Sequence, residues 1–183
     1  MILPIYAYGC PVLRKKGEDI SPDYPNLKEI IDNMYETMYN SSGIGLAAPQ
    51  VGIPIRLFII DGSPIEDINP PGFKQTFINP QIIKEWGEEW KYEEGCLSIP
   101  TIRENVSRKP ELTIRFLDEN FVEHEKTYDG MAARIIQHEY DHIEGKLFVD
   151  HISPLKRNLI KSKLNNISLG KVNHDYKMKF VKK

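Results

Sequence analysis

Apolar residues recur at helical spacing between residues 26 and 40. On a helix they would form one apolar stripe, made of Leu27, Ile30, Ile31, Met34, Tyr35 and Met38. Asn26 followed three residues later by Glu29 resembles a capping box at the start of this helix. The stripe predicts a helix that packs on a core by one face, and it implies no cofactor.

Between residues 53 and 128 the apolar period shortens to that of strands. Strands are predicted at 55–60 (IRLFII) and 77–83 (FINPQII), and two more flank Asp118-Glu119-Asn120 as a hairpin. One face of this hairpin would carry Leu112, Ile114 and Phe116. Residues 61–75 are rich in Pro, Gly and Asp, so we expect a long exposed loop there that could modulate access to a site.

A second helix is predicted over residues 130–143, with Asp129 as N-cap and Gly145 as its stop. Its first half is apolar nearly all round, which is typical of a buried helix. Residues 153–167 have the period of a third, amphipathic helix, and 176–181 alternate like a short final strand. We therefore expect an α+β fold in which antiparallel β-sheets pack around a central buried helix.

The 183 residues favour one catalytic domain, 1–183, with 27% charged and 40% hydrophobic residues as in soluble globular proteins. No apolar run approaches the roughly 18 residues of a membrane span, and the N-terminus lacks the basic region of a signal peptide. We expect a cytoplasmic protein with no membrane partner. In a reducing compartment, a disulfide between Cys10 and Cys96 is not expected.

The net charge of −2 conceals an uneven distribution. The tail from about residue 154, predicted as helix and strand, carries nine of the 24 basic residues and one of the 26 acidic residues. A basic tail of this kind can contact phosphates of RNA or membranes, although a solvated lysine-rich terminus is an equal alternative.

The predicted helix at 130–143 contains HEYDH, in which His138 and His142 lie four residues apart. Positions i and i+4 share one helix face, so both imidazoles can reach one metal ion. Glu139 lies about 100° round the helix from His138, where it can act as a general base on a bound water. Two surface histidines on a polar helix are the alternative, which the apolar character of this helix disfavours.

A catalytic metal usually takes three protein ligands and keeps one position open, so a third ligand must come from elsewhere. Downstream, Glu144 lies too close to the helix histidines and His151 follows the helix stop. Upstream, Cys96 in EEGCLSIP, between predicted strands, offers a thiolate that binds zinc or ferrous iron strongly. Cys10 is interpreted as a small buried residue.

The segment GIGLAAPQVG, residues 43–52, formally matches the dinucleotide-binding pattern G-x-G-x-x-A. That pattern follows a strand and opens a helix, whereas this segment follows a predicted helix, and Pro49 does not fit inside a helix. A loop whose glycines let the backbone approach an extended ligand fits better, with Gln50 as an amide donor. An ordinary glycine turn is the alternative.

Together the three segments resemble the peptide deformylase family, which removes the formyl group from the N-terminal methionine of new bacterial or organellar chains. The family's motifs stand in order as GIGLAAPQ (43–50), EGCLS (94–98) and HEYDH (138–142), with no motif position missing. The resemblance implies three metal ligands, namely Cys96, His138 and His142. It also implies that Glu139 takes a proton from a water at the fourth position and later protonates the departing amine.

The resemblance further implies that the Gln50 side-chain amide and the Leu97 backbone N–H stabilise charge on the formyl oxygen. The implied substrate-binding residues are Gly45, Ile44, Gly95 and Ile135. Gly45 would pair with the substrate backbone like an added strand, and the two isoleucines would line a pocket for the methionine side chain. Asp141 is expected to be a structural carboxylate and not a ligand.

One divalent metal is expected as cofactor: Fe²⁺ in the cell by the resemblance, while Zn²⁺, Ni²⁺ or Co²⁺ suits the same ligands. The expected partners are N-formyl-methionyl nascent peptides and, through the basic tail, ribosomal RNA; no DNA partner is expected. One alternative is an H-E-x-x-H metallopeptidase with a longer cleft and another third ligand. A structural zinc or binding module is the other, and it would need a fourth protein ligand.

Overall fold

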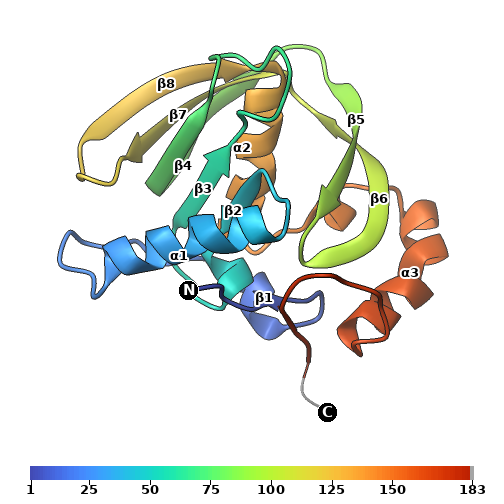
Figure 1. Cartoon of the computed structure of the whole chain (residues 1–183). Coiled ribbons are helices and arrows are strands. Elements are labelled where there is room, and N and C mark those ends of the chain that lie inside the picture. The colour runs from blue at the N-terminus through green and yellow to red at the C-terminus, as the bar shows by residue number, and fades with distance from the viewer. Residues whose placement is uncertain (182–183) are drawn as a thin grey trace.

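The largest sheet of residues 1–181 is antiparallel and five-stranded, in the order β2-β3-β4-β7-β8 (Figure 1). The structure is a computed structural model and describes residues 1–181. The sheet consists of β2 (Gly45–Ala47), β3 (Leu57–Asp61), β4 (Lys74–Trp86), β7 (Glu111–Leu117) and β8 (Glu123–Asp129). Two further pairs are β5 (Trp90–Cys96) with β6 (Ile99–Arg108), antiparallel, and β1 (Ile5–Tyr6) with β9 (Met178–Lys179), parallel. The helices are α1 (Leu27–Asn40), α2 (Gly130–Ile143) and α3 (Pro154–Ser168), with 3₁₀ turns at Pro11–Arg14, Ala48–Val51 and Phe148–Asp150.

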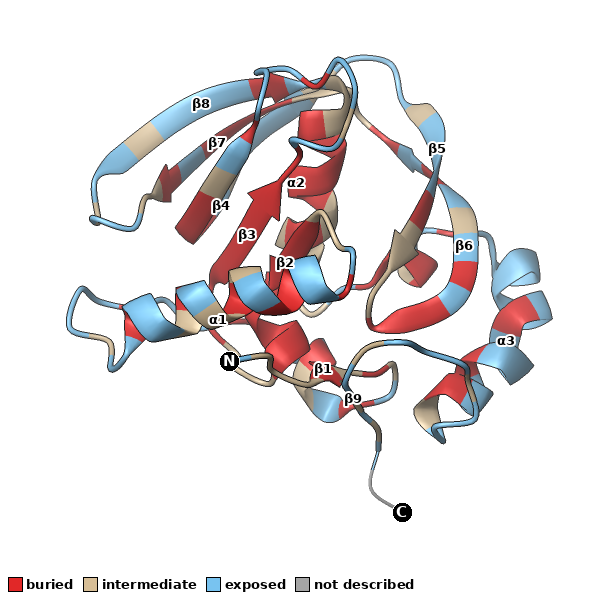
Figure 2. Ribbon diagram, in the orientation of Figure 1, coloured by how far each residue is buried: buried red, intermediate tan, exposed pale blue. Residues whose placement is uncertain are grey.

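Strand β3 lies between two helices and is buried on both faces. Its alternation sends Phe58 and Ile60 into one hydrophobic cluster with α2, and Leu57 and Ile59 into another with α1. Figure 2 shows α2 as a mostly buried helix at the centre of the molecule. Each fully buried side chain of this size contributes about 1.5–3 kcal/mol of hydrophobic stabilisation, so α2 is held firmly. The predicted α+β fold with a central buried helix is confirmed.

The helix boundaries agree closely with the sequence pattern, but the caps do not. Asn26 occupies the N-cap of α1 with φ 56° and makes no side-chain cap bond, so the predicted capping box is wrong. Capping requires extended backbone at the N-cap, and Asn26 instead takes the left-handed conformation that asparagine tolerates. Asp129 is the N-cap residue of α2, yet its carboxylate accepts a bond from Asn69 and not from the helix.

Three other expectations need correction. The segment 61–75 is not simply an exposed loop, because Ile68 and Phe73 are buried in the cluster with α2. Cys96 does not lie between separate strands; it ends β5 of a long hairpin with β6. The last predicted strand, β9, forms a parallel pair, so not every pair is antiparallel. The predicted β7–β8 hairpin is confirmed, with Leu112, Ile114 and Phe116 buried on one face.

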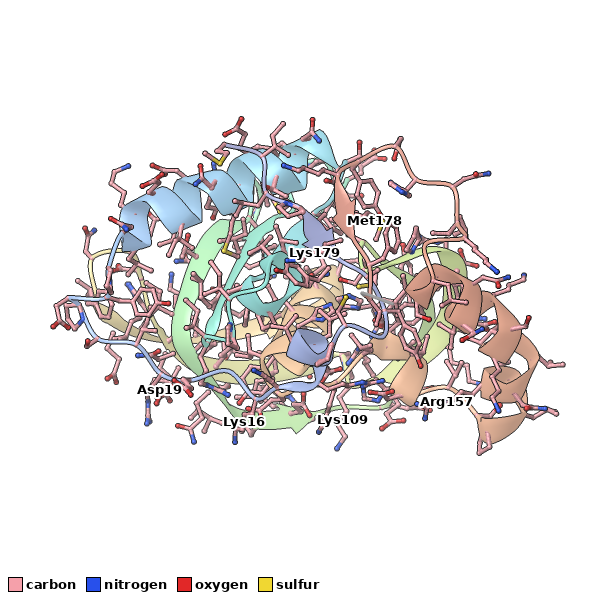
Figure 3. The ribbon with its side chains drawn as sticks, turned by 90° about the horizontal axis from the view of Figure 1, so that it is seen from below. Lys16, Asp19, Lys109, Arg157, Met178 and Lys179 are labelled. Carbon is pink, nitrogen blue, oxygen red and sulfur yellow. The ribbon has the colours of Figure 1, made fainter. Side chains whose placement is uncertain are left out.

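The C-terminal part folds back onto the start of the chain. A third cluster joins α3 to β6 and to the turn after α2, with Ile160, Leu164 and Ile167 facing inward. Beyond α3 the chain returns, and Met178 and Lys179 pair with Ile5 and Tyr6 (Figure 3). Two lysines of the predicted basic tail, Lys182 and Lys183, lie outside the described residues.

Among the helices of residues 1–181, none combines the length and apolar character that crossing a bilayer requires. Cys10 is buried and free, as predicted for a small core residue.

Candidate active site

Cys96 is the last residue of β5, and Leu97 begins the turn that follows it. The pairing of β5 with β6 shifts register between Gly95 and Cys96, so Cys96 comes opposite Ile99 and the hairpin closes in a tight turn. Two bonds hold this turn: Tyr8 N–H donates to the Ser98 carbonyl at 2.8 Å, and the Tyr176 hydroxyl donates to the Leu97 carbonyl at 2.7 Å. The Cys96 thiol is therefore presented from a fixed hairpin end.

Helix α2 presents His138, Glu139 and His142 to the same place. The ligand atoms of Cys96, His138 and His142 all lie within 4.8 Å of one another, and the Cys96 Sγ to His142 Nε2 distance is 3.4 Å. Atoms that bind one ion at about 2.0–2.3 Å have separations in this range. The structure thus brings together all three predicted ligands, and a thiolate with two imidazoles suits a divalent transition metal.

Glu94 fixes the orientation of His138. Its Oε1 lies 2.8 Å from His138 Nδ1, which leaves Nε2 of that imidazole for the ion. The same carboxylate accepts bonds from Arg108 at 2.7 and 3.0 Å and from Arg134 at 2.6 Å. Burial alone would raise the pKa of Glu94, but the bonds from His138 and Arg108 hold it well below its usual range. Glu94 is therefore an ionised, fully bonded support beneath the ligand.

Glu139 differs from Glu94, although both carboxylates are buried. Its Oε2 has no hydrogen-bond partner among the described residues. Burial, only partly offset by His138, raises the pKa of Glu139 to about 7, so the group can both take and give a proton at neutral pH. Gly45 allows this close approach, because a Cβ there would lie 2.8 Å from Glu139 Cδ.

Gln50 lies in the 3₁₀ turn Ala48–Val51, directly after β2. Its Oε1 accepts the Ala47 N–H at 2.9 Å, which directs Nε2 towards the site. Nε2 lies 3.4 Å from Cys96 Sγ and 3.2 Å from Ser98 Oγ. The amide is thus a pre-oriented donor beside the three candidate ligands.

A cavity of about 630 Å³ opens onto these groups. The four predicted substrate-binding residues all line it, namely Ile44, Gly45, Gly95 and Ile135. Strand β2 is an edge strand of the sheet, so an extended peptide could add to it. Ile65, from the segment 61–75, also lines the cavity, which places that segment at the site.

Several site residues were not identified from the sequence. Glu94 belongs to the EGCLS motif, which marked it without giving its role. Arg134 packs over the Trp90 ring at 4.3 Å and binds Glu94, a role that depends on contacts across distant segments. Tyr176 gave no signal at all, since it lies 79 residues from its partner Leu97. Asp141 bonds to Arg108 and His151, in agreement with its predicted structural role.

Comparisons with known proteins agree with this geometry. The sequence pattern of the polypeptide deformylase family matches residues 2–158. The chain is 59% identical to the peptide deformylase of Christiangramia forsetii, over 98% of this chain and 96% of the relative. It is 60% identical to that of Flavobacterium johnsoniae, over 99% and 97%. The fold matches a peptide deformylase from Legionella pneumophila with a TM-score of 0.83 and 35% identity, over 96% of this chain and 100% of that one. The chain therefore belongs to the polypeptide deformylase family of metalloenzymes and removes the N-formyl group from nascent peptides.

Proposed function

We propose that Cys96, His138 and His142 hold one divalent metal ion, Fe²⁺ in the cell, and that Glu139, Gln50 and Leu97 carry out the rest of the deformylation chemistry. The donor set supports this proposal, because a thiolate and two imidazoles converge within 4.8 Å. Zn²⁺, Ni²⁺ and Co²⁺ suit the same donors and can replace iron in a purified sample. When bound, the ion acts as a Lewis acid that makes hydroxide available near neutral pH.

Glu139 is the proposed general base and acid. Its buried Oε2 lacks a partner in residues 1–181 and adjoins the ligand His138, so an incoming water is the group that would satisfy it. Glu139 accepts the proton of this water as the water attacks the formyl carbon. It then returns the proton to the departing amine, which leaves formate and a free N-terminus.

Gln50 and the Leu97 backbone N–H are the proposed donors to the formyl oxygen. Negative charge develops on this oxygen in the transition state, so donors already in position stabilise the transition state more than the ground state. The Ala47 N–H that fixes the Gln50 amide provides such pre-organisation. We expect these two donors to affect kcat more than KM.

The cavity suggests how the peptide is held. The substrate backbone would pair with β2 at Gly45, as a strand added to the free edge of the sheet. The methionine side chain would then enter between Ile44 and Ile135, with Gly95 leaving room on the hairpin side. This arrangement admits an N-terminal residue and differs from the longer cleft that cutting an internal peptide bond needs.

The observation that carries the proposal is the convergence of three metal-binding side chains beside a buried carboxylate without a partner. The test is metal content and formate release for wild type and Cys96→Ala, loaded anaerobically with Fe²⁺. Wild type should bind one ion per chain and release formate from a short N-formyl-methionyl peptide, whereas Cys96→Ala should lose tight metal binding. Full metal occupancy in Cys96→Ala would refute the ligand assignment.

We also propose that the basic tail contacts ribosomal RNA, which would place the enzyme in the cytoplasm beside emerging chains. Lys161 and Lys163 are exposed on α3 and support this idea by their charge. Cosedimentation with ribosomes should fall when both lysines are changed to glutamate. Unchanged cosedimentation of the double variant at low and moderate salt would remove the idea.

A further inference from the structure

We propose that Tyr176 is a positioning residue for deformylation, because its hydroxyl holds the carbonyl of Leu97, the residue whose N–H is a proposed donor to the formyl oxygen. The C-terminal return segment, defined as residues 169–181, would then be one wall of the active site. The inference rests on the proposed role of Leu97.

The path of the return segment brings it to the site. Helix α3 ends at Ser168, and Gly170 with φ 75° takes the left-handed conformation that lets the chain reverse. The segment then runs beside β1, where Ile5 N–H donates to the Lys177 carbonyl and Ala7 N–H to the Lys179 carbonyl, both at 2.9 Å (Figures 1 and 3). These backbone bonds fix the segment on both sides of Met178.

Tyr176 lies immediately before this anchored stretch. Its hydroxyl donates to the Leu97 carbonyl at 2.7 Å, and both residues pack on the hydrophobic cluster that contains α1. Leu97 is the residue whose N–H is the proposed donor to the formyl oxygen. The bond restrains the peptide group after the Leu97 Cα, and the N–H belongs to the peptide group before the same Cα, so only φ and ψ of Leu97 separate the restrained carbonyl from the N–H.

The carbonyl of Ser98, the next residue, is held by a backbone donor. Ser98 accepts the backbone N–H of Tyr8, so the segment directly after β1 supports the turn from one side through the main chain. The Tyr176 bond comes from a side chain, and it can be removed by substitution without changing any backbone bond. The hairpin end is thus held from both chain termini, and one of the two restraints is open to test.

The return segment also contributes directly to the cavity. Asn173, His174, Asp175 and Tyr176 line the same space as Gln50 and Glu139. The His174 ring bonds to the Tyr176 carbonyl through Nδ1 at 2.8 Å, which orders the stretch between them. The family's sequence pattern ends at residue 158, so the shared motifs assign no role to this segment.

The size of the effect follows from what one bond can do. Tyr176→Phe keeps the ring packing and removes only the hydroxyl. The net contribution of one ordinary hydrogen bond corresponds to about a 3- to 10-fold change in an equilibrium constant. If the lost bond raises the transition-state free energy by that amount, kcat should fall by the same factor. KM should stay within about 2-fold, because a donor to the transition state is disturbed and the substrate contacts are retained.

The test compares four proteins loaded with the same metal: wild type, Tyr176→Phe, Tyr35→Phe and Glu139→Ala. Tyr35 is the matched control, since its hydroxyl bonds to Thr76 away from the cavity. Metal content, unfolding midpoint, kcat and KM are measured with one N-formyl-methionyl peptide. The inference predicts a lower kcat for Tyr176→Phe, with full metal content, and wild-type kinetics for Tyr35→Phe.

The inference is overturned if Tyr176→Phe has the wild-type kcat, or if its loss of activity follows loss of metal or a change in KM alone. The proposed function is tested separately in the same series. If wild type releases formate and Glu139→Ala does not, that function stands whatever Tyr176→Phe shows.

Discussion

The two sides of the active site differ in how their buried polar atoms are satisfied. The supporting side lies between β5, β6 and α2, where Glu94 accepts bonds from Arg108, Arg134 and His138. The reacting side faces the cavity, where Glu139 Oε2 has no partner among residues 1–181 and Gln50 Nε2 donates over 3.2 and 3.4 Å to Ser98 Oγ and Cys96 Sγ. On the supporting side both oxygens of the Glu94 carboxylate are hydrogen-bonded, although Arg134 Nε has no partner among residues 1–181, whereas on the reacting side the carboxylate oxygen Glu139 Oε2 remains available.

The difference shows how one fold meets two opposite requirements. A buried polar atom without a partner is rare and destabilises the fold by about 1–3 kcal/mol, so it is expected only where another molecule supplies the partner. The proposed ligand His138 shows the reverse, since its bonded second nitrogen fixes the ring and its tautomer, whereas the second nitrogen of His142, Nδ1, has no partner among residues 1–181. The hydrogen bonds of Glu94 on the supporting side hold the ring of His138 in place while Glu139 Oε2 on the reacting side stays free for another molecule.

The largest effect on kcat is expected when the reacting side loses the carboxylate of Glu139. Glu139→Ala removes the proposed proton carrier, so kcat should fall by about 10³-fold or more, within the range known for general acid–base groups. Metal content should be kept, because Glu139 is not a proposed ligand. Stability should hold or rise, since a buried carboxylate without a full set of partners is removed. Steady-state kinetics, metal analysis and thermal unfolding together check this result.

Glu144→Ala is the control for that variant. Glu144 follows α2 and pairs with Arg56 at 2.7 Å, outside the cavity lining. It should lower stability and leave kcat as in wild type. An equal loss of kcat in Glu139→Ala and Glu144→Ala would contradict a specific catalytic role for Glu139.

On the supporting side, Glu94→Ala should lower both the free energy of unfolding and the metal affinity. It leaves Arg108 and Arg134 buried without their shared carboxylate, and breaking such a buried pair typically destabilises by about 3–5 kcal/mol. Loss of the bond to His138 should weaken metal affinity by about 10- to 100-fold. Urea unfolding and metal titration measure the two effects. A variant that unfolds and binds metal like wild type would show that the charge network is not a support.

Gln50→Ala should have the next largest effect, on rate. Removing one pre-organised donor to the formyl oxygen should lower kcat by about 10²–10³-fold, with a small change in KM. A larger change in KM than in kcat would assign Gln50 to substrate binding. Kinetics over a range of peptide concentrations separates the two results.

The smallest effect is expected at an exposed ion pair. Arg115 bonds to Glu125 at 2.9 Å across β7 and β8, with nearly half of each side chain exposed. Arg115→Ala should change stability by less than about 1 kcal/mol, whereas Arg108→Ala removes a buried arginine that serves two carboxylates. If Arg115→Ala and Arg108→Ala lose comparable unfolding free energy, burial does not determine how much these ion pairs stabilise the protein.

The sequence predicted the parts of this site that depend on local spacing. The i, i+4 spacing placed His138 and His142 on one face of α2, and alternation placed Leu112 and Ile114 on the buried face of β7. The three motifs then indicated the family and, through it, Cys96. These features need only the period of a helix or strand, or a short contiguous pattern.

What the sequence did not predict depends on pairings between distant segments. The partners of Glu94 lie up to 44 residues away, and the partner of Tyr176 lies 79 residues away, so no local pattern reveals them. The capping prediction at Asn26 failed because residue type alone does not set φ at a helix start. The prolines and glycines of residues 61–75 predict an exposed loop, whereas Ile68 and Phe73 anchor the segment in the core through contacts that no local pattern reveals.

The most direct test of the division between the two sides is formate release per bound metal ion, measured on wild type, Glu139→Ala and Glu94→Ala with one N-formyl-methionyl peptide. We predict that Glu139→Ala keeps its metal and releases almost no formate, whereas Glu94→Ala binds metal weakly but retains most of the turnover per ion bound. The opposite pattern, with metal lost from Glu139→Ala and turnover per ion abolished in Glu94→Ala, would contradict the account.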